Sequence, residues 1–198
     1  MTKRAVDVVG AVIGLVLLWP VMVIVAIAIR VTMGRPVLFR QERAGRSGAP
    51  FELLKFRTMR EGAGTDAERL TRVGRLLRST SLDELPQLWN VLRGDMSLVG
   101  PRPLYVRYIP LYSDRQRRRL EVRPGITGLA QIEGRNSLDW PQRLELDVRY
   151  VESRGLLLDL RIMWRTVAAV VHRDGISGAG TVTMTPFTGT RPTDRSDE

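Results

Sequence analysis

Two adjacent carboxylates, Asp83 and Glu84, are the residues whose types and spacing best suit catalysis. An ionised aspartate can act as a nucleophile toward phosphorus, and a neighbouring glutamate can hold Mg²⁺ that screens a diphosphate. Both side chains are therefore candidate catalytic residues and candidate Mg²⁺ ligands. The stretch also fits a structural role, because Ser81 followed by Glu84 has the spacing of a capping box at a helix N-terminus. The spacing alone leaves both interpretations open.

Basic side chains occur where a bound diphosphate would need them. Lys55 and Arg57 share one face of a predicted strand, and Arg102 lies between two prolines that restrict its backbone. Arg135 follows in a segment that contains glycine. These four residues are candidate phosphate-binding groups, although each also fits a solvated surface charge in a chain with 31 lysines and arginines. A separate run predicts a basic face toward an anionic membrane or solvent: Arg115, Arg117, Arg118 and Arg119.

The composition excludes several other kinds of chemistry. The chain has 198 residues, which is the size of one compact domain with a short appendage. It has no cysteine, which excludes disulfide-stapled modules, thiol catalysis, zinc fingers and iron–sulfur centres. A single histidine, His172, excludes a zinc site built from several imidazoles. The net charge of +10 predicts an anionic partner, either nucleic acid, an anionic lipid surface or a phosphorylated substrate.

An uncharged apolar run covers the 22 residues Val8–Ile29. As a helix it would be about 33 Å long, enough to cross a hydrocarbon core of ~30 Å. Pro20 lies near its middle and should kink or break the helix. Basic residues flank both ends, and positive flanks tend to stay in the cytoplasm. A helix that bends at Pro20 and returns to the same leaflet satisfies both observations, so the re-entrant and spanning interpretations stay equally open.

The remaining segments predict short strands and helices. Val37–Glu42 and Phe51–Met59 flank a turn-rich stretch and predict a β-hairpin. From Gly175 onward the chain is rich in Gly, Pro and Thr and is expected to form a loose tail. We expect helices in four places: Arg72–Arg78, Ser81–Arg93, Trp140–Ser153 and Leu156–His172.

Four motifs, in the family's order, make the chain similar to the bacterial sugar transferase family. They are KFRTM (Lys55–Met59), TSLDELPQLWNVLRGDMSLVGPRPL (Thr80–Leu104), RPGITGLAQIEGRN (Arg123–Asn136) and LDVRYVESRGLLLDLRIM (Leu146–Met163). The resemblance covers residues 1 to about 190. The family consists of monotopic polyprenyl-phosphate phosphoglycosyltransferases, and the chain resembles its small members, which contain the catalytic core alone.

The resemblance implies an enzyme that moves a sugar 1-phosphate from a UDP-sugar to a polyprenyl phosphate such as undecaprenyl phosphate. UMP is released, and the reaction is the first membrane step of glycoconjugate assembly. The resemblance implies that Asp83 is the nucleophile and that Glu84 acts in Mg²⁺ binding or proton transfer. It implies further active-site positions at Lys55, Arg102, Arg135 and Asp147, and it matches Pro20 to the helix-breaking proline of a re-entrant helix.

The resemblance also implies a membrane-monotopic α+β fold. The expected parts are a re-entrant membrane helix over residues 1–35, a catalytic domain over 36–174 and an extended tail over 175–198. The catalytic domain would be a small cytosolic α/β head with interfacial amphipathic helices, placed at the cytoplasmic face of the bacterial inner membrane. Its partners would be anionic phospholipids and the two substrates, not nucleic acid, and a homodimer is allowed.

Several points stay open at this stage. The small members suggest an N-acetylated amino sugar, such as diacetylbacillosamine, but the sugar, the polyprenol and the pathway are not determined by the sequence. An alternative function is that of a membrane-anchored basic scaffold or nucleic-acid-binding protein without catalysis. That alternative explains the charge and the apolar run, but it gives no reason for Asp83 and Glu84 in a chain that also contains the VGPRP segment (Val99–Pro103).

Overall fold

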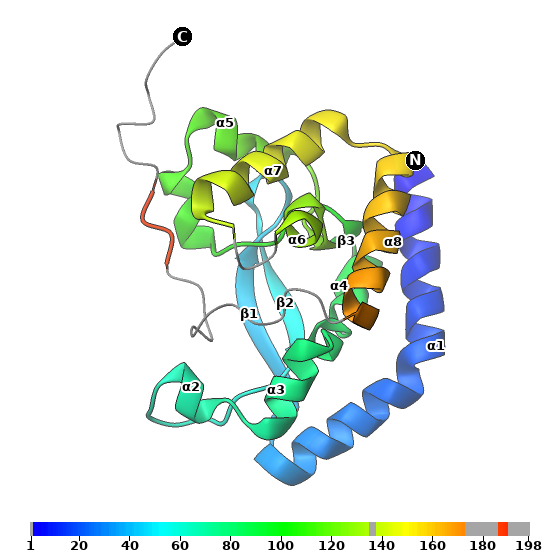
Figure 1. Ribbon diagram of the computed structural model, residues 1–198, viewed down its shortest axis with the longest axis vertical. Coiled ribbons are helices and arrows are strands. Elements are labelled where there is room, and N and C mark those ends of the chain that lie inside the picture. The colour runs from blue at the N-terminus through cyan, green and yellow to red at the C-terminus, as the bar shows by residue number, and fades with distance from the viewer. Residues whose placement is uncertain (1, 135–137, 173–185, 190–198) are drawn as a thin grey trace.

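The computed structural model describes residues 2–134, 138–172 and 186–189, which form a mixed α+β fold with two small sheets (Figure 1). The α-helices are α1 (Thr2–Met33), α2 (Asp66–Arg69), α3 (Arg72–Ser79), α4 (Gln87–Arg93), α5 (Asp114–Arg117), α6 (Leu129–Glu133), α7 (Trp140–Ser153) and α8 (Leu156–His172). The strands are β1 (Leu38–Ala44), β2 (Pro50–Phe56), β3 (Ser97–Val99) and β4 (Gly125–Thr127). Short 3-10 helices complete the described elements: η1 (Arg46–Gly48), η2 (Leu82–Glu84), η3 (Val106–Leu111) and η4 (Arg118–Glu121).

The apolar N-terminal run forms α1, which is long and apolar enough to cross a membrane. Of the two effects expected of Pro20, a kink or a break, the structure shows no break, because α1 continues through Pro20 as one helix of 32 residues. Figure 1 shows that α1 bends part-way along its length. A proline inside a helix removes one backbone hydrogen bond and crowds the preceding turn, which accounts for a bend without a break.

Both ends of α1 are bound to the rest of the molecule. Near its start, the buried carboxylate of Asp7 accepts a hydrogen bond of 2.8 Å from the hydroxyl of Ser97 in β3. At its end, the guanidinium of Arg57 donates to the carbonyl oxygen of Met33 at 2.6 Å. The two ends of α1 are therefore held by one and the same domain.

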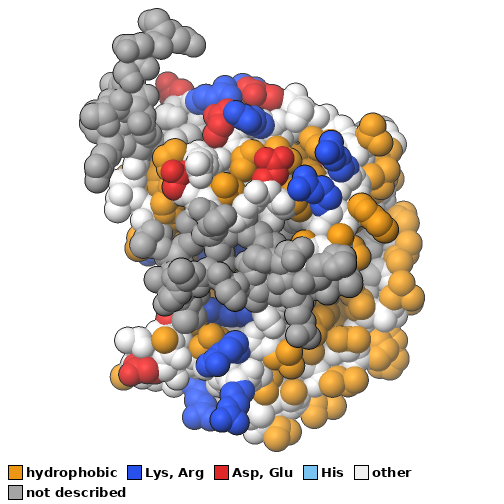
Figure 2. Space-filling model, viewed as in Figure 1, with side chains coloured by type: hydrophobic (Ala, Val, Ile, Leu, Met, Phe, Trp, Pro, Cys, Tyr) orange, Lys and Arg blue, Asp and Glu red, His pale blue; other side chains and the backbone are white. Residues whose placement is uncertain are grey.

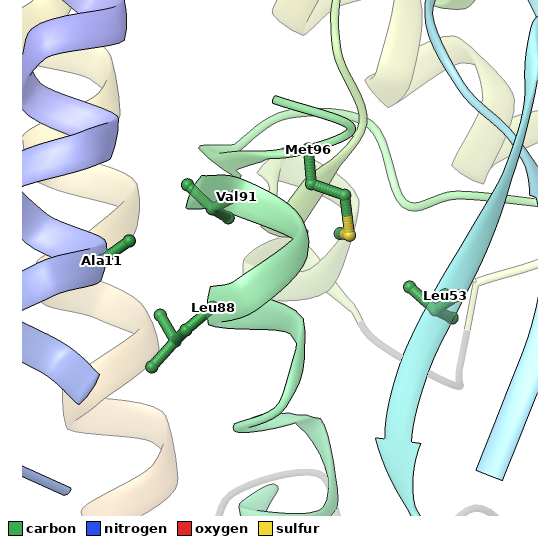
Figure 3. Packing of buried hydrophobic residues seen from close by; sticks show 5 residues of the cluster. All are labelled: Ala11, Leu53, Leu88, Val91 and Met96. Atoms are coloured by element: carbon green, nitrogen blue, oxygen red, sulfur yellow. The ribbon is translucent and has the colours of Figure 1, made fainter. Parts of the chain in front are cut away.

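The middle of α1 packs closely on α4. Small residues make this approach possible, since a Cβ atom added at Gly14 would lie 3.1 Å from a methyl carbon of Leu88. Figure 3 shows Ala11 of α1 facing Leu88 and Val91 of α4, while Leu53 of β2 lies on the opposite side of α4. These residues are all buried in one hydrophobic cluster. The helix α4 is thus held between α1 and the hairpin.

The predicted hairpin is confirmed by the antiparallel pairing of β1 with β2, from Leu38 opposite Phe56 to Ala44 opposite Pro50. Both faces of β2 are covered, because Leu53 packs toward α4 and Phe56 packs in a cluster with residues of α1 and α3. This packing holds Lys55 at a defined place near the end of the strand.

The parallel pair β3 and β4 frames the segment that carries Arg102. Ser97 pairs with Gly125 and Val99 pairs with Thr127. The two backbones approach so closely that a Cβ atom at Gly125 would lie 2.1 Å from the amide nitrogen of Gly100. Glycine at this point therefore lets β3 and β4 pair directly before the Arg102 loop.

The remaining predicted helices agree with the structure in three of four places, namely α3, α7 and α8. The fourth, Ser81–Arg93, is divided in two and is described with the site below. Within the expected C-terminal tail the structure describes 186–189, where Phe187 is buried against Tyr108 and Trp140. The rest of that expected tail lies outside the described residues.

Apolar side chains gather along the edge of the molecule that α1 occupies (Figure 2). Exposed residues of α1 include Val16, Leu17 and Ile24. The neighbouring helix α8 also exposes apolar side chains, Leu157 and Trp164 among them. A surface of this kind is typical of contact with lipid or with another protein.

Candidate active site

Asp83 and Glu84 lie on η2, a one-turn 3-10 helix between α3 and α4. The capping box considered for this stretch is wrong, because Ser81 has a left-handed backbone (φ 57°, ψ 16°) and its side chain makes no capping hydrogen bond. A capping serine normally needs an extended backbone to direct its hydroxyl to the first free amides of a helix. The two carboxylates are therefore not explained by helix capping.

The predicted helix over Ser81–Arg93 is two elements, η2 and α4. Pro86 occupies the N-cap position of α4, with φ −61° and ψ −18°. Proline has no backbone N–H to donate, so it is tolerated at a helix start and costly inside a helix. The chain turns at Pro86, and Gly94 ends α4 with a left-handed φ of 93°.

Glu84 is held by two cations that come from different parts of the fold. Its Oε1 atom accepts a hydrogen bond of 2.6 Å from Lys55 Nζ at the end of β2 and one of 2.6 Å from Arg102 Nη2 in the loop after β3. Burial alone would raise the pKa of Glu84, but the charges of Arg102 and Lys55 outweigh burial and hold this pKa well below its usual range. Glu84 is therefore an ionised, fixed carboxylate.

Asp83 differs from its neighbour in its hydrogen bonding and in the direction in which its pKa is shifted. It is 7% exposed, and burial raises the pKa of its carboxyl to about 6, against the opposing charge of Lys55. Lys55 Nζ lies 3.9 Å from Asp83 Oδ2, and within the residues that the structure describes the Asp83 carboxylate makes no hydrogen bond. A carboxylate with raised basicity and free lone pairs is suited to nucleophilic attack.

Asp147 lies behind Arg102 and is connected to it through Arg119. Arg119 donates to Asp147 Oδ2 from Nε at 3.1 Å and from Nη2 at 2.8 Å. The Nη2 atom of Arg119 also donates to the backbone carbonyl oxygen of Arg102 at 2.6 Å. Arg119 and Asp147 are 3% and 1% exposed. The structure thus places Asp147, which was expected to bind substrate, in a buried support for the Arg102 loop.

Arg119 is the site residue that sequence reasoning missed, because it was grouped with a basic surface run. That grouping is wrong for Arg119 and correct for Arg115 and Arg118, whose side chains are 51% and 41% exposed and pair with Glu145 and Glu152 of α7. The run crosses from α5 into η4, and this change of helix geometry turns Arg119 inward. No signal in the sequence separates Arg119 from its neighbours.

Arg57 does not join the cluster around Glu84. Arg57 is 6% exposed and donates to Met33, Gly34 and Arg35 carbonyl oxygens at 2.6, 2.9 and 3.2 Å. The expectation that Arg57 binds a phosphate beside Lys55 is therefore corrected, because its guanidinium binds the backbone at the end of α1. Arg135 lies outside the described residues.

The donor set fits a hard cation that is held partly by substrate. Among the described residues there is no cluster of three or more His, Cys, Asp or Glu side chains that could hold a metal ion alone. Mg²⁺ is usually bound through one or two carboxylates together with the phosphates of a substrate, so it does not require such a cluster. Asp83 and the Glu84 oxygen that is not bonded to Lys55 or Arg102 are suitable oxygen ligands.

A family model described as "Bacterial sugar transferase" matches residues 1–173 of the chain. Among curated proteins, the chain is 48% identical over 193 residues to a protein named "Uncharacterized sugar transferase EpsL" from Bacillus subtilis (strain 168). That match covers 94% of this chain and 96% of the relative.

Two further relatives have more specific names. The chain is 45% identical over 190 residues to a "UDP-glucose:undecaprenyl-phosphate glucose-1-phosphate transferase" from Caulobacter vibrioides, with 88% of this chain and 71% of the relative covered. It is 40% identical over 196 residues to a "UDP-galactose-lipid carrier transferase" from Erwinia amylovora, with 87% of this chain and 41% of the relative covered.

Proposed function

The chain belongs to the bacterial sugar transferase family, and on that premise we propose that it transfers a sugar 1-phosphate from a UDP-sugar to polyprenyl phosphate and releases UMP. Relatives named as undecaprenyl-phosphate sugar-phosphate transferases support this activity. They speak against the alternative of a non-catalytic basic scaffold. The names of the relatives include both UDP-glucose and UDP-galactose, so the sugar that this chain transfers stays open.

The observation that carries the proposal is the division of roles between the two adjacent carboxylates. Glu84 is fixed by Lys55 and Arg102 at 2.6 Å each, whereas Asp83 is buried beside them without a hydrogen bond in the described part of the chain. Glu84 is thus held in an ion-pair cluster with Lys55 and Arg102, whereas the carboxylate of Asp83 is available to react. Such a pair suits a covalent mechanism better than general acid–base hydrolysis, in which both groups must exchange protons.

In the first step, an Asp83 carboxylate oxygen attacks the β-phosphorus of the UDP-sugar. A bond forms between this oxygen and the β-phosphorus, the bond from the β-phosphorus to the bridging oxygen breaks, and UMP leaves with that bond's electron pair. The product is an acyl phosphate that carries the sugar. Arg102 and Lys55 lie where positive charge can stabilise the phosphoryl oxygens.

In the second step, a phosphate oxygen of polyprenyl phosphate attacks the same phosphorus. The bond to Asp83 breaks, the carboxylate is restored, and polyprenyl diphosphate sugar leaves. Splitting the transfer lets two large substrates use one phosphoryl site in turn. When Mg²⁺ is bound by Asp83 or Glu84 together with a diphosphate, it supplies charge neutralisation on the leaving UMP.

The arrangement of α1 supports a re-entrant placement in the membrane. Both ends of this helix are bound to the same domain, through Asp7 with Ser97 and through Arg57 with Met33. If α1 crossed the bilayer, its two ends would lie on opposite sides of the membrane. One domain on one side could then not contact both ends. We therefore place the domain at the cytoplasmic face of the bacterial inner membrane, with anionic headgroups beside the basic helix α3.

The direct test is a panel of donors with the purified protein in detergent or nanodiscs. UDP-glucose, UDP-galactose and an N-acetylated UDP-amino sugar are each mixed with undecaprenyl phosphate and Mg²⁺, and UMP release is measured. At least one donor should give UMP and a lipid-linked sugar diphosphate. If no donor in a broad panel gives UMP from protein that is folded and membrane-bound, the proposed transferase function is wrong.

A further inference from the structure

A second group of cations lies next to the Arg102 loop and has no part in the mechanism above. Arg43 is the penultimate residue of β1, and Tyr105 follows Arg102 by three positions. A backbone hydrogen bond of 2.9 Å from the amide of Ala44 to the carbonyl oxygen of Leu104 joins these two segments. The end of the hairpin is therefore tied to the same loop that carries Arg102.

Two guanidinium groups lie on one aromatic ring in this group. The Cζ atom of Arg43 is 3.8 Å from the centroid of the Tyr105 ring, and that of Arg107 is 4.4 Å from the same centroid. Gln41 supports the arrangement, because its side-chain oxygen accepts a hydrogen bond from Arg43 and its Nε2 lies 3.5 Å from the Tyr105 hydroxyl. Stacking on a ring orients a guanidinium and leaves its edge N–H groups available to an anion.

These cations have no acidic partner in the ranges that the structure describes. Neither Arg43 nor Arg107 forms an ion pair there, whereas Arg40 on the same strand pairs with Glu52 at 2.9 Å. The Nε atom of Arg43 is buried without a hydrogen-bond partner among the described residues. Like charges brought together without counter-ions cost folding energy, and a bound anion removes that cost.

The electrostatics agree with this geometry. Burial lowers the pKa of Arg43, Tyr105 partly offsets burial, and the nearby charge of Arg102 lowers the pKa further. The charge of Arg102 thus acts on Arg43, and the backbone hydrogen bond from Ala44 to Leu104 holds the two segments together. Because Arg102 is bonded to Glu84, the Tyr105 group is connected to the catalytic carboxylates through a single residue.

We propose that Arg43 and Arg107, seated on Tyr105, form a second phosphate-binding subsite beside Arg102. This inference rests on the proposed function, in which the attacked phosphorus lies at Asp83 and each substrate brings a further phosphate near it. The ligand is a phosphate ester, and two sources fit: the nucleotide-side phosphate of the UDP-sugar, or the phosphate of the polyprenyl acceptor. Forked guanidinium groups match phosphate oxygens in either case.

The test separates these two sources by kinetics. Arg43→Gln and Arg43→Lys are assayed for UMP release while the UDP-sugar and the polyprenyl phosphate are varied in turn. Arg43→Gln should raise KM for one substrate about 10-fold, since a charge-assisted hydrogen bond is lost. Arg43→Lys should recover this loss in part, because it keeps the charge and loses the fork. A raised KM for the UDP-sugar assigns the subsite to the donor, and one for polyprenyl phosphate assigns it to the acceptor.

A binding measurement that does not depend on turnover uses UMP and inorganic phosphate as probes. One of these anions should raise the melting temperature of the wild-type protein, and the rise should be smaller in Arg43→Gln. Arg40→Gln is the matched control, because it removes an exposed arginine that is already paired on the same strand.

The proposal is overturned if both KM values and the anion-induced shift of Arg43→Gln equal those of wild type. It is also overturned if Arg43→Gln lowers kcat alone, which would make Arg43 a support for the hairpin. Absence of UMP release from the wild-type protein would instead overturn the proposed transferase function, and the probe-binding result would still decide the subsite.

Discussion

Asp83 and Glu84 are neighbours on a single turn, yet their pKa values move in opposite directions. Burial raises the pKa of Asp83 to about 6, whereas Arg102 and Lys55 overcome burial at Glu84 and lower its pKa. The difference arises because both cations donate a hydrogen bond to Glu84 Oε1, whereas Asp83 has only a longer contact of 3.9 Å with Lys55. Two identical functional groups thus acquire different chemistry from their surroundings.

This difference predicts which carboxylate carries the covalent intermediate. Wild-type enzyme mixed with a UDP-sugar alone should release UMP in an amount near that of the enzyme and acquire a phosphosugar adduct on Asp83. Asp83→Asn should show neither, because an amide is a poor nucleophile. Intact-protein mass spectrometry with rapid-quench UMP detection measures both.

Glu84→Gln is the comparison, since it keeps the size and removes the charge that holds Lys55 and Arg102. It should slow adduct formation without moving the adduct to another residue. If UMP appears only when polyprenyl phosphate is present and no adduct accumulates, the transfer is direct and the covalent mechanism is wrong.

Arg102 should not be replaceable by lysine. One N–H group of its Nη2 atom is donated to Glu84 at 2.6 Å, so a phosphate can bind through the other donors of the planar guanidinium, a fork that lysine lacks. We expect Arg102→Lys to lower kcat about 100-fold, the usual cost of removing one donor to a developing charge. The assay is UMP release, and circular dichroism and membrane fractionation should match wild type.

The exposed Arg93 of α4 provides a control for Arg102, because Arg93→Lys changes a residue whose only described ion pair is a 3.6 Å contact with Asp95. That variant should keep full activity. Near-wild-type turnover of Arg102→Lys would show that Arg102 acts as a simple positive charge.

The buried pair of Arg119 and Asp147 should act on catalysis through Arg102. Arg119→Lys keeps the charge but loses the donor that reaches the Arg102 carbonyl oxygen at 2.6 Å. We expect Arg119→Lys to lower kcat, because the loop that carries Arg102 is displaced. The KM for the acceptor should stay unchanged, because the contact of the protein with the membrane is not altered. Asp147→Asn, which keeps the shape and weakens the ion pair, should show a smaller loss of the same kind.

A double-mutant comparison tests the connection. If both residues act through Arg102, adding Arg119→Lys to Arg102→Lys should cause little further loss of kcat. Fully additive losses of kcat would mean that Arg119 supports the fold independently of Arg102. In that case the melting temperature of Arg119→Lys should also fall.

The carboxylates predict dependence on a divalent cation. Activity should disappear in excess EDTA and return with Mg²⁺ or Mn²⁺, since these ions accept oxygen ligands from one or two carboxylates and a diphosphate. Ca²⁺, which prefers more ligands at longer distances, should restore less. Full turnover in chelator would contradict a metal-assisted reaction.

The re-entrant placement of α1 predicts where its ends lie. Single cysteines introduced at Thr2 and Arg35 should both react with a membrane-impermeant thiol reagent from the cytoplasmic side, because the native chain contains no cysteine to interfere. Pro20→Leu should straighten α1 and reduce the labelling of one end. Labelling of the two wild-type positions from opposite sides would show that α1 spans the bilayer.

The sequence by itself determined the local elements and marked the candidate reactive pair. Strand-type alternation around a turn-rich stretch predicted the hairpin, and apolar spacing predicted α7 and α8, because these patterns depend on residues close together in the chain. The types of Asp83 and Glu84 with their family motif marked them as catalytic candidates. Spacing alone left a capping box as the competing interpretation.

The tertiary structure decided which charges meet. Lys55 reaches Glu84 from β2 and Arg102 from the loop after β3, while Arg57, two residues beyond Lys55, binds the end of α1. Arg119 is buried on Asp147 although Arg115 and Arg117 of the same run are exposed. The left-handed backbone of Ser81, which removes the capping box, arises where α3 turns into η2. The charge pairings depend on contacts between distant segments, and a pattern of neighbouring residues contains no information about them.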